Sequence, residues 1–168
     1  YCNPNGKCPQ LAPEPLSWDD LLWMTSLSAE HLGVEALRIT GGEPTVRPGL
    51  VPWIQEVREK ATGIRNIGLT TNGILLETMA HSLSDAGVNR VNISLDSLRP
   101  EKFHQITRGG DLNRVLAGLS AARKHFDVVK VNVVALRDRN LDELADFISF
   151  SASEDIEIRF IEPMPLGD

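Results

Sequence analysis

"IRNIGLTTNGILLETMAHSLSDAGVNRVNISLD", residues 64–96, decides the fold, because two strand-like runs lie on either side of one helix-like run. Residues 64–70 and 88–96 are short runs with β-branched residues, which are typical of strands. Between them, residues 75–87 place apolar side chains at the three-to-four spacing of one buried helix face. A strand, a crossover helix and a second strand predict a right-handed βαβ unit with parallel strands.

The same alternation extends over most of the 168 residues. A first helix-like run begins after Ser17, a good N-cap residue, and ends at Gly33, a typical helix stop. Strand-like runs then recur at residues 35–40, 64–70, 88–96, 128–136 and 156–162. Helix-like runs between them occupy residues 49–61, 75–87, 112–126 and 141–153. Strands that alternate with helices predict a parallel sheet covered by helices.

The fold class is therefore α/β, and we expect part of a TIM-like (β/α) barrel with parallel strands and outer helices. A doubly wound open sheet is the alternative. Either architecture places its chemistry at the carboxyl ends of the strands. On the first helix, we expect Trp18 and Trp23 to cover the core.

Composition excludes several classes of function. The net charge of −6 disfavours binding to nucleic acid or to an anionic membrane, although one small anion held by local cations remains compatible. No apolar run approaches the roughly 20 residues of a membrane span. The two cysteines, Cys2 and Cys8, do not make a disulfide framework, so we expect a reducing, cytoplasmic location.

Three cations, Arg38, Lys130 and Arg159, lie inside predicted strands. A charge in a buried strand costs several kcal/mol without a partner. One hypothesis is that the three cations share one polyanion, such as a triphosphate. The alternative is that each pairs with a local carboxylate, for example Arg159 with Glu157 or Glu162.

"TGGEP", residues 40–44, ends the first predicted strand. Gly41 and Gly42 are compatible with a tight turn that needs positive φ. Alternatively, they let the amino and carboxylate groups of a ligand approach the main chain, and Glu43, held rigid by Pro44, accepts hydrogen bonds from an ammonium group. The chain has no G-x-G-x-x-G and no Walker pattern, so neither a Rossmann nor a P-loop site is supported.

At these motifs the sequence resembles the radical S-adenosylmethionine (SAM) superfamily, in which "GGEP" follows a barrel strand. "YC" at Tyr1-Cys2 resembles the end of the C-x₃-C-x₂-C signature of that superfamily. Within it, the chain is similar to the GTP 3′,8-cyclase family of molybdenum cofactor biosynthesis. The similarity is carried, in order, by "LRITGGEPTVRPGL", "IGLTTNG", "VNISLDSL", "ITRGGDLNRVLAGL", "VKVNVV" and "IRFIEPMPLG".

The resemblance implies a site with two kinds of ligand. Cys2 would be one thiolate ligand of a [4Fe–4S] cluster whose open iron binds SAM. The residues implied to contact SAM are Tyr1, Gly41, Gly42, Glu43, Pro44, Ser94 and Met164. Those implied to hold GTP are Arg38, Thr70, Lys130 and Arg159, with the cations on the triphosphate.

The implied activity is of the lyase type. One electron from the cluster cleaves SAM, the resulting 5′-deoxyadenosyl radical removes the 3′ hydrogen of GTP, and the ribose radical adds to C8 of guanine. The protein contributes binding, orientation and the exclusion of competing reactions. No side chain is assigned a catalytic role of its own.

Residues 1–168 are expected to be a fragment of a single radical SAM core domain. Two cluster cysteines, the first strand and the region of a second cluster are missing, and Cys8 has the wrong spacing to replace a cluster ligand. We therefore expect the fragment to be inactive and to hold its cofactors weakly or not at all. An unpaired sheet edge would also favour pairing of two copies as a homodimer.

Two alternative functions remain open. The chain is also compatible with another radical SAM enzyme, one that modifies a peptide or a tetrapyrrole. A non-catalytic nucleotide-binding or scaffold module, in which "GGEP" is merely a turn, is the other alternative. Convergence of the three cations on one place would favour the nucleotide substrate.

Overall fold

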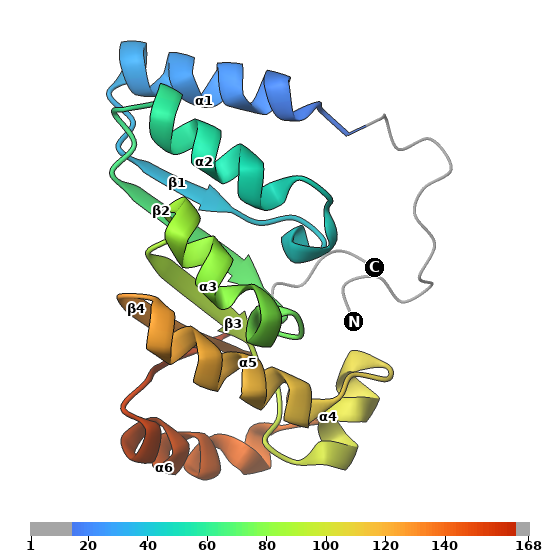
Figure 1. Ribbon diagram of the computed structural model, residues 1–168. Coiled ribbons are helices and arrows are strands. Elements are labelled where there is room, and N and C mark those ends of the chain that lie inside the picture. Colours follow the sequence, from blue (N-terminus) through green and yellow to red (C-terminus); the bar gives the residue numbers. More distant parts are fainter. Residues whose placement is uncertain (1–14, 164–168) are drawn as a thin grey trace.

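The computed structural model describes residues 15–163, and all structural statements concern that part of the chain. Five strands alternate with helices along the chain (Figure 1). The strands are β1 (Ala36–Ile39), β2 (Asn66–Thr71), β3 (Arg90–Ser94), β4 (Val128–Val134) and β5 (Glu157–Ile161). The α-helices are α1 (Trp18–Leu32), α2 (Leu50–Lys60), α3 (Leu76–Ala86), α4 (Pro100–Thr107), α5 (Leu112–His125) and α6 (Leu144–Glu154).

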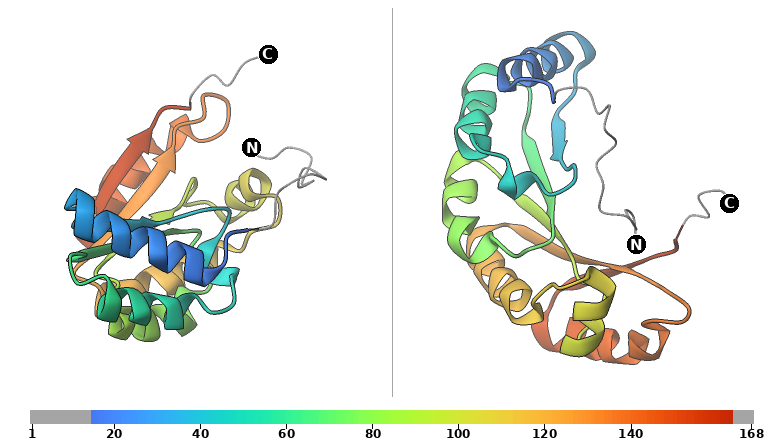
Figure 2. Two further views of the ribbon diagram at one scale, coloured as in Figure 1. Left: turned by 90° about the horizontal axis from the view of Figure 1, so that it is seen from above. Right: turned by 90° about the vertical axis from the view of Figure 1, so that its right-hand side faces the viewer.

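The strands form one sheet in the order β1-β2-β3-β4-β5, and every neighbouring pair is parallel. Strand order therefore follows chain order without the reversal that defines a doubly wound sheet. The helices form an outer layer around one face of a curved sheet (Figure 2). The prediction of a partial (β/α) barrel is confirmed, and within residues 15–163 the sheet does not close.

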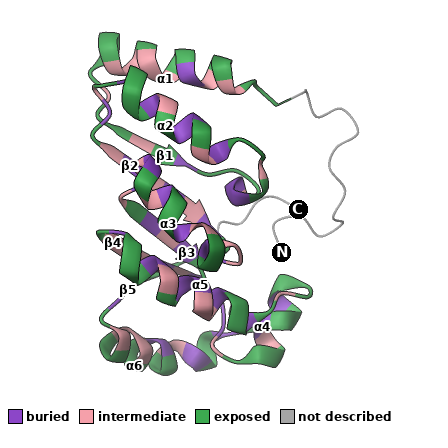
Figure 3. Cartoon of the chain, in the orientation of Figure 1, coloured by how far each residue is buried: buried purple, intermediate pink, exposed green. Residues whose placement is uncertain are grey.

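The core lies between the helices and the convex face of the sheet (Figure 3). Burial alternates along the strands, most regularly in β2, where every second residue is buried. The buried apolar positions of the three central strands carry Ile67, Leu69, Val91, Ile93, Val131 and Val133, and Thr71 is the buried polar residue at the end of β2. The other positions face the concave side, which no described helix covers. A period of two gives each strand an apolar face for the core and a free face for a site.

Both ends of α1 form as predicted. Ser17 accepts a hydrogen bond from the amide of Asp20, whose side chain accepts one from the Ser17 amide, so the two residues make a capping box. Gly33 ends the helix in the left-handed conformation, with φ of 65°. A side chain is unfavourable in this conformation, which explains why glycine is the stop.

One prediction about the core is half wrong. Trp18 stacks on Trp53 with 5.0 Å between ring centroids and covers the core as expected. Trp23, however, is 65% exposed. Leu22 is the buried residue of α1, and the side chain of Trp23, one residue further, points away from the core. The packed stripe of α1 is too narrow to include both tryptophans.

The helix α4 was not predicted from the sequence. It is a short helix that begins at Pro100, and it buries Phe103 and Ile106. Proline in the first helical turn is a known start signal, because its missing N–H needs no partner there. The prediction for residues 141–153 was displaced, since a 3₁₀ turn (Leu141–Glu143) precedes α6. Among residues 15–163, no helix is both long and apolar enough to cross a membrane.

Candidate nucleotide site on the concave face

Register brings the predicted cations onto one face of the sheet. Lys130 on β4 lies beside Asn92 on β3 and Glu157 on β5, and Arg159 lies beside Asn132. Arg38 on β1 lies beside Gly68 on β2. All of these residues occupy the alternate strand positions whose side chains face away from the helices. The strand order and the period of two therefore place side chains more than a hundred residues apart on a common surface.

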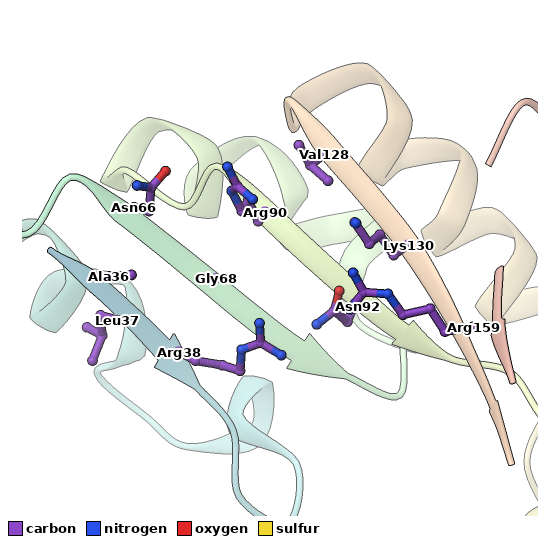
Figure 4. A pocket seen from close by; sticks show the side chains of 10 residues that line it. All are labelled: Ala36, Leu37, Arg38, Asn66, Gly68, Arg90, Asn92, Val128, Lys130 and Arg159. Carbon is purple, nitrogen blue, oxygen red and sulfur yellow. The ribbon is translucent and has the colours of Figure 1, made fainter. Parts of the chain in front are cut away.

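A cavity of about 370 Å³ lies over this surface. Figure 4 shows its lining, with Arg38 entering from one side and Lys130 and Arg159 from the other. Its lining residues are Ala36, Leu37, Arg38, Asn66, Gly68, Arg90, Asn92, Val128, Lys130 and Arg159. The structure thus brings together the three cations singled out by the sequence. Thr70, the fourth residue implied for the substrate, lies beside Asn92 in the register but does not line the cavity.

Two of the three cations also have a local carboxylate partner. Glu157 accepts a hydrogen bond from Lys130 Nζ at 2.6 Å and one from Arg159 Nε at 2.7 Å. The hydrogen bond from Lys130, which has the larger effect, and the one from Arg159 hold the pKa of Glu157 below its ordinary value of 4.5. Convergence and local pairing were posed as alternatives, but the structure combines them through one shared carboxylate.

Arg38 differs from these two cations. In the part of the chain that the structure describes, it forms no ion pair, and its side chain is exposed. A guanidinium remains charged at any physiological pH and presents five N–H donors. Arg38 is therefore ready to bind an anion without first releasing a protein partner.

Glu43 lies at the carboxyl end of β1, where it begins the 3₁₀ turn η1 (Pro44–Val46). Its Oε1 accepts hydrogen bonds from the amide and hydroxyl of Thr45 and from Thr71 Oγ1, and its Oε2 accepts one from the amide of Asn72 at 2.6 Å. The carboxylate thus ties the loop after β1 to the loop after β2. A carboxylate has about four acceptor positions, two on each oxygen, so the free capacity for an ammonium group is on Oε2.

Gly41 and Gly42 form an open ledge before Glu43. Gly41 has φ of 153°, which L side chains rarely adopt, so a backbone requirement explains this glycine. Gly42 has no such constraint, and a Cβ there would meet no atom within 4 Å. Packing within residues 15–163 does not require the second glycine. The ledge therefore leaves room for a ligand to approach the main chain, and buried Pro44 fixes its far side.

Ser94 ends β3 beside Asn132 of β4, at the same carboxyl edge of the sheet. The Ser94 side chain is exposed. The Oδ1 atom of Asn132 is buried and has no hydrogen-bond partner among the described residues. This edge therefore has an exposed hydroxyl at Ser94 and, at Asn132, a buried acceptor without a partner among the described residues.

Tyr1, Cys2 and Met164, which the sequence resemblance assigned to the cofactors, lie outside the described residues. Residues 15–163 contain no group of three or more His, Cys, Asp and Glu side chains that could hold a metal ion. The described part of the chain therefore has an open main-chain ledge at Gly41 and Gly42, but no ligand set for an iron–sulfur cluster.

A buried polar network behind the carboxyl edge was missed by sequence reasoning. Glu143 is fully buried and accepts hydrogen bonds from Ser97 Oγ and from the amide of Leu98 at 2.8 Å. Asn140 donates to the carbonyls of Asp96 and Val134 at 2.7 and 2.8 Å. These contacts fasten the loop after β3 to the loop after β4. Apart from the contact of Asn140 with Val134, the partners lie about 45 residues apart in the sequence, so no local pattern reveals them.

Comparison with known proteins now defines the class of this protein. The model of the Radical SAM superfamily matches residues 1–151, so the chain belongs to this superfamily. Solved structures agree at the level of the fold. The chain matches native anSMEcpe with bound AdoMet with a TM-score of 0.73 at 18% identity, over 94% of this chain and 46% of that one. Coproporphyrinogen III oxidase (HemN) from Escherichia coli, a radical SAM enzyme, gives 0.65 at 17% identity, over 89% and 38%.

Particular relatives share much more sequence. The chain is 45% identical to the GTP 3′,8-cyclase of Alkaliphilus oremlandii over 100% of this chain and 52% of that protein. Identity to the GTP 3′,8-cyclase of Geobacter sulfurreducens is 46%, over 98% of this chain and 51% of that protein. The chain spans about half the length of the curated relatives that it matches.

Proposed function

We propose that residues 1–168 are a core fragment of a cytoplasmic GTP 3′,8-cyclase of molybdenum cofactor biosynthesis, which converts GTP to 3′,8-cyclo-7,8-dihydroguanosine triphosphate. The observation that carries the proposal is the convergence of Arg38, Lys130 and Arg159 on one cavity of the concave face. The similarity to GTP 3′,8-cyclases along the whole chain supports the same substrate. An enzyme acting on an uncharged substrate gains nothing from three cations in one place.

The proposed role of the cations is to hold the triphosphate. Lys130 and Arg159 are oriented by Glu157 before any ligand arrives, so less side-chain freedom is lost on binding. Arg38 approaches from the opposite side of the cavity and donates without a competing carboxylate (Figure 4). Thr70, which lies beside Asn92 in the register and outside the cavity lining, is proposed to contact the nucleotide next to these cations. Together they fix the position of the phosphates, and through them the position of the ribose.

SAM is proposed to bind at the carboxyl edge. Its amino group would donate to Glu43 Oε2 and its carboxylate would lie on the main chain of Gly41 and Gly42, beside Pro44. Ser94 faces the same edge from β3, and Tyr1 and Met164 are proposed to complete the contacts. Cys2 would supply one thiolate to the [4Fe–4S] cluster, which together with SAM provides hydrogen-abstracting radical chemistry. In this arrangement the ledge and the cavity would keep the two ligands in a constant relation to each other.

The test uses the full-length natural protein, reconstituted without oxygen with iron and sulfide and supplied with SAM and dithionite. Release of 5′-deoxyadenosine should depend on added GTP, and it should fall about tenfold or more in Arg159→Ala or Lys130→Ala, because each removes a charge-assisted contact to phosphate. Arg114→Ala, which changes an exposed cation on the outer helix α5, is the matched control. Turnover of SAM that is indifferent to GTP would instead favour a radical SAM enzyme with a peptide or tetrapyrrole substrate.

A further inference from the structure

A fourth cation lines the cavity of the concave face. Arg90 of β3 lies beside Gly68 in the register, and Gly68 in turn lies beside Arg38. The side chain of Arg90 is exposed, and it forms no ion pair with any residue of the described part of the chain. Sequence reasoning missed Arg90, although it shares the alternate positions of β3 with Asn92 and Ser94 and therefore lies on the concave face.

The charges around this cavity are unbalanced. Among residues 15–163, its lining contains four cations, Arg38, Arg90, Lys130 and Arg159, and no carboxylate. Glu157, just outside the lining, compensates Lys130 and Arg159 but reaches neither Arg38 nor Arg90. Like charges held together without counter-ions repel one another, and the free energy of this repulsion is recovered when an anion binds.

The floor between Arg38 and Arg90 is bare because residue 68 is glycine. A Cβ at Gly68 would meet nothing nearer than the carbonyl oxygen of Leu37 at 3.8 Å, which is an ordinary contact. Internal packing therefore does not require glycine here. Figure 4 shows the uncovered strand at Gly68, with Asn66 and Asn92 on the same side of the sheet as the cations. A group with several acceptor oxygens fits this floor, since the main chain is open and donors surround it.

Position along the strands decides which end of a ligand reaches Arg90. Arg90 lies two residues nearer the amino ends of the strands than Asn92, which is aligned with Lys130. This step corresponds to roughly 6.6 Å along the sheet. The ledge at Gly41 and Gly42 lies at the opposite, carboxyl end. A nucleotide whose ribose is near that ledge and whose phosphate chain runs inward would bring its terminal phosphate to Arg90.

We propose that Arg90 and the bare floor at Gly68 form the subsite for the terminal phosphate of a nucleoside triphosphate. Arg90 then determines the preference for a triphosphate over a shorter phosphate chain, while Lys130 and Arg159 bind the phosphates nearer the ribose. This inference rests on the proposed function for the identity of the nucleoside, but the phosphate subsite is testable without it.

The experiment measures the affinities of phosphate, pyrophosphate, tripolyphosphate and GTP for the full-length natural protein by calorimetry at fixed ionic strength. Wild-type protein should prefer tripolyphosphate to pyrophosphate. Arg90→Gln should weaken tripolyphosphate and GTP binding about tenfold or more and leave pyrophosphate nearly unchanged, because it removes one charge-assisted contact. Arg90→Lys should retain part of the affinity. Arg114→Gln on α5 makes the same change in net charge and should have little effect.

Gly68→Ala is an independent variant that does not alter charge. Its methyl group makes only ordinary contacts, so the fold should be kept, as thermal unfolding can verify. The methyl group occupies the floor and should weaken tripolyphosphate binding severalfold. Equal losses in Arg90→Gln and Arg114→Gln, or an unchanged preference for tripolyphosphate in Arg90→Gln, would overturn the subsite.

The outcomes separate the subsite from the proposed function. If tripolyphosphate binding depends on Arg90 but GTP does not compete for the site, the subsite stands and the proposed substrate fails. If GTP binds through Lys130 and is insensitive to Arg90→Gln, the proposed function stands and the subsite fails. Absence of any tripolyphosphate binding to the wild-type protein would also overturn the subsite.

Discussion

At the scale of single residues, the site depends on carboxylates that organise their neighbours. Glu157 orients Lys130 and Arg159, and Glu43 joins two loops through four hydrogen bonds. The sequence was sufficient to single out the cations, because a charge inside a strand is unusual. It was not sufficient to find the partners of Glu43, since Thr71 and Asn72 lie 28 and 29 residues away and only the fold brings them near.

Glu157→Gln should strengthen polyphosphate binding severalfold at neutral pH. The carboxylate competes with phosphate for Lys130 and Arg159 and repels it, whereas the amide does neither. Calorimetry with tripolyphosphate measures the change, and Glu154→Gln, which removes a carboxylate paired with Arg123 on the outer helices, is the control. Weaker binding in Glu157→Gln would show that orientation of the cations matters more than competition.

The same carboxylate predicts a pH dependence of stability. Because the pKa of Glu157 is lowered in the folded state, its contribution to stability is complete above its ordinary pKa of 4.5. The contribution is lost as the pH falls through the lower, folded pKa. The difference in unfolding free energy between wild-type and Glu157→Gln should therefore shrink between about pH 5 and pH 3. A difference that grows toward acid pH would contradict the sign of the shift.

Glu43→Gln should destabilise the fold by about 1–3 kcal/mol, because an amide nitrogen replaces an acceptor that serves a protein donor. Urea unfolding measures this loss. In Glu56→Gln, which breaks an exposed pair with Lys60 on α2, little change is expected. If the two variants are equally stable, the carboxylate of Glu43 does not join the loops in solution.

At the scale of elements, the loops at the carboxyl edge are held by buried polar contacts rather than by apolar packing alone. Strands and most helices could be predicted from the sequence, because their periodicity is a local property. The short helix α4 was missed, since eight residues give too few turns for a periodic signal, although Pro100 marks its start and Gly109 and Gly110 follow its end. The buried hydrogen bonds that join the loops after β3 and β4 could not be predicted either. Glu143 is a charged residue, and its burial depends on its contacts with Ser97 and Leu98.

Glu143→Ala should be among the most destabilising single substitutions in this chain. It leaves the Ser97 hydroxyl and the Leu98 amide without their buried acceptor, at a cost of about 2–4 kcal/mol. Hydrogen exchange should show faster opening of residues 95–99 before the strands open. Asp142→Ala next to it, whose side chain is half exposed and pairs with Lys102 and Arg99, should change stability far less. Comparable losses of stability in the two variants would argue against a stabilising role for the buried hydrogen bonds of Glu143.

At the scale of the whole molecule, the sheet is covered by helices on one face, and its concave face is free for ligands. Within residues 15–163, β1 pairs only with β2, so one of its edges is unpaired. On the neighbouring helix α1, Trp23 and Leu32 are 65% and 76% exposed. Exposed apolar side chains beside an open edge favour association.

We therefore expect the 168-residue chain to self-associate. Sedimentation velocity should show dimers or larger species that dissociate on dilution. Trp23→Glu combined with Leu32→Glu should shift the distribution toward the monomer, because it places charge on the exposed apolar surface. A monomer at high concentration for the unaltered chain would contradict this expectation.

The most direct test of the concave face as a polyphosphate site compares GTP and guanosine as ligands of the full-length natural protein. If the cations hold the triphosphate, GTP should bind at least about a hundredfold more tightly than guanosine, since each charge-assisted contact contributes roughly a factor of ten. The double variant Lys130→Gln/Arg159→Gln should lose most of this advantage. Equal affinities for GTP and guanosine in the wild-type protein would contradict the assignment.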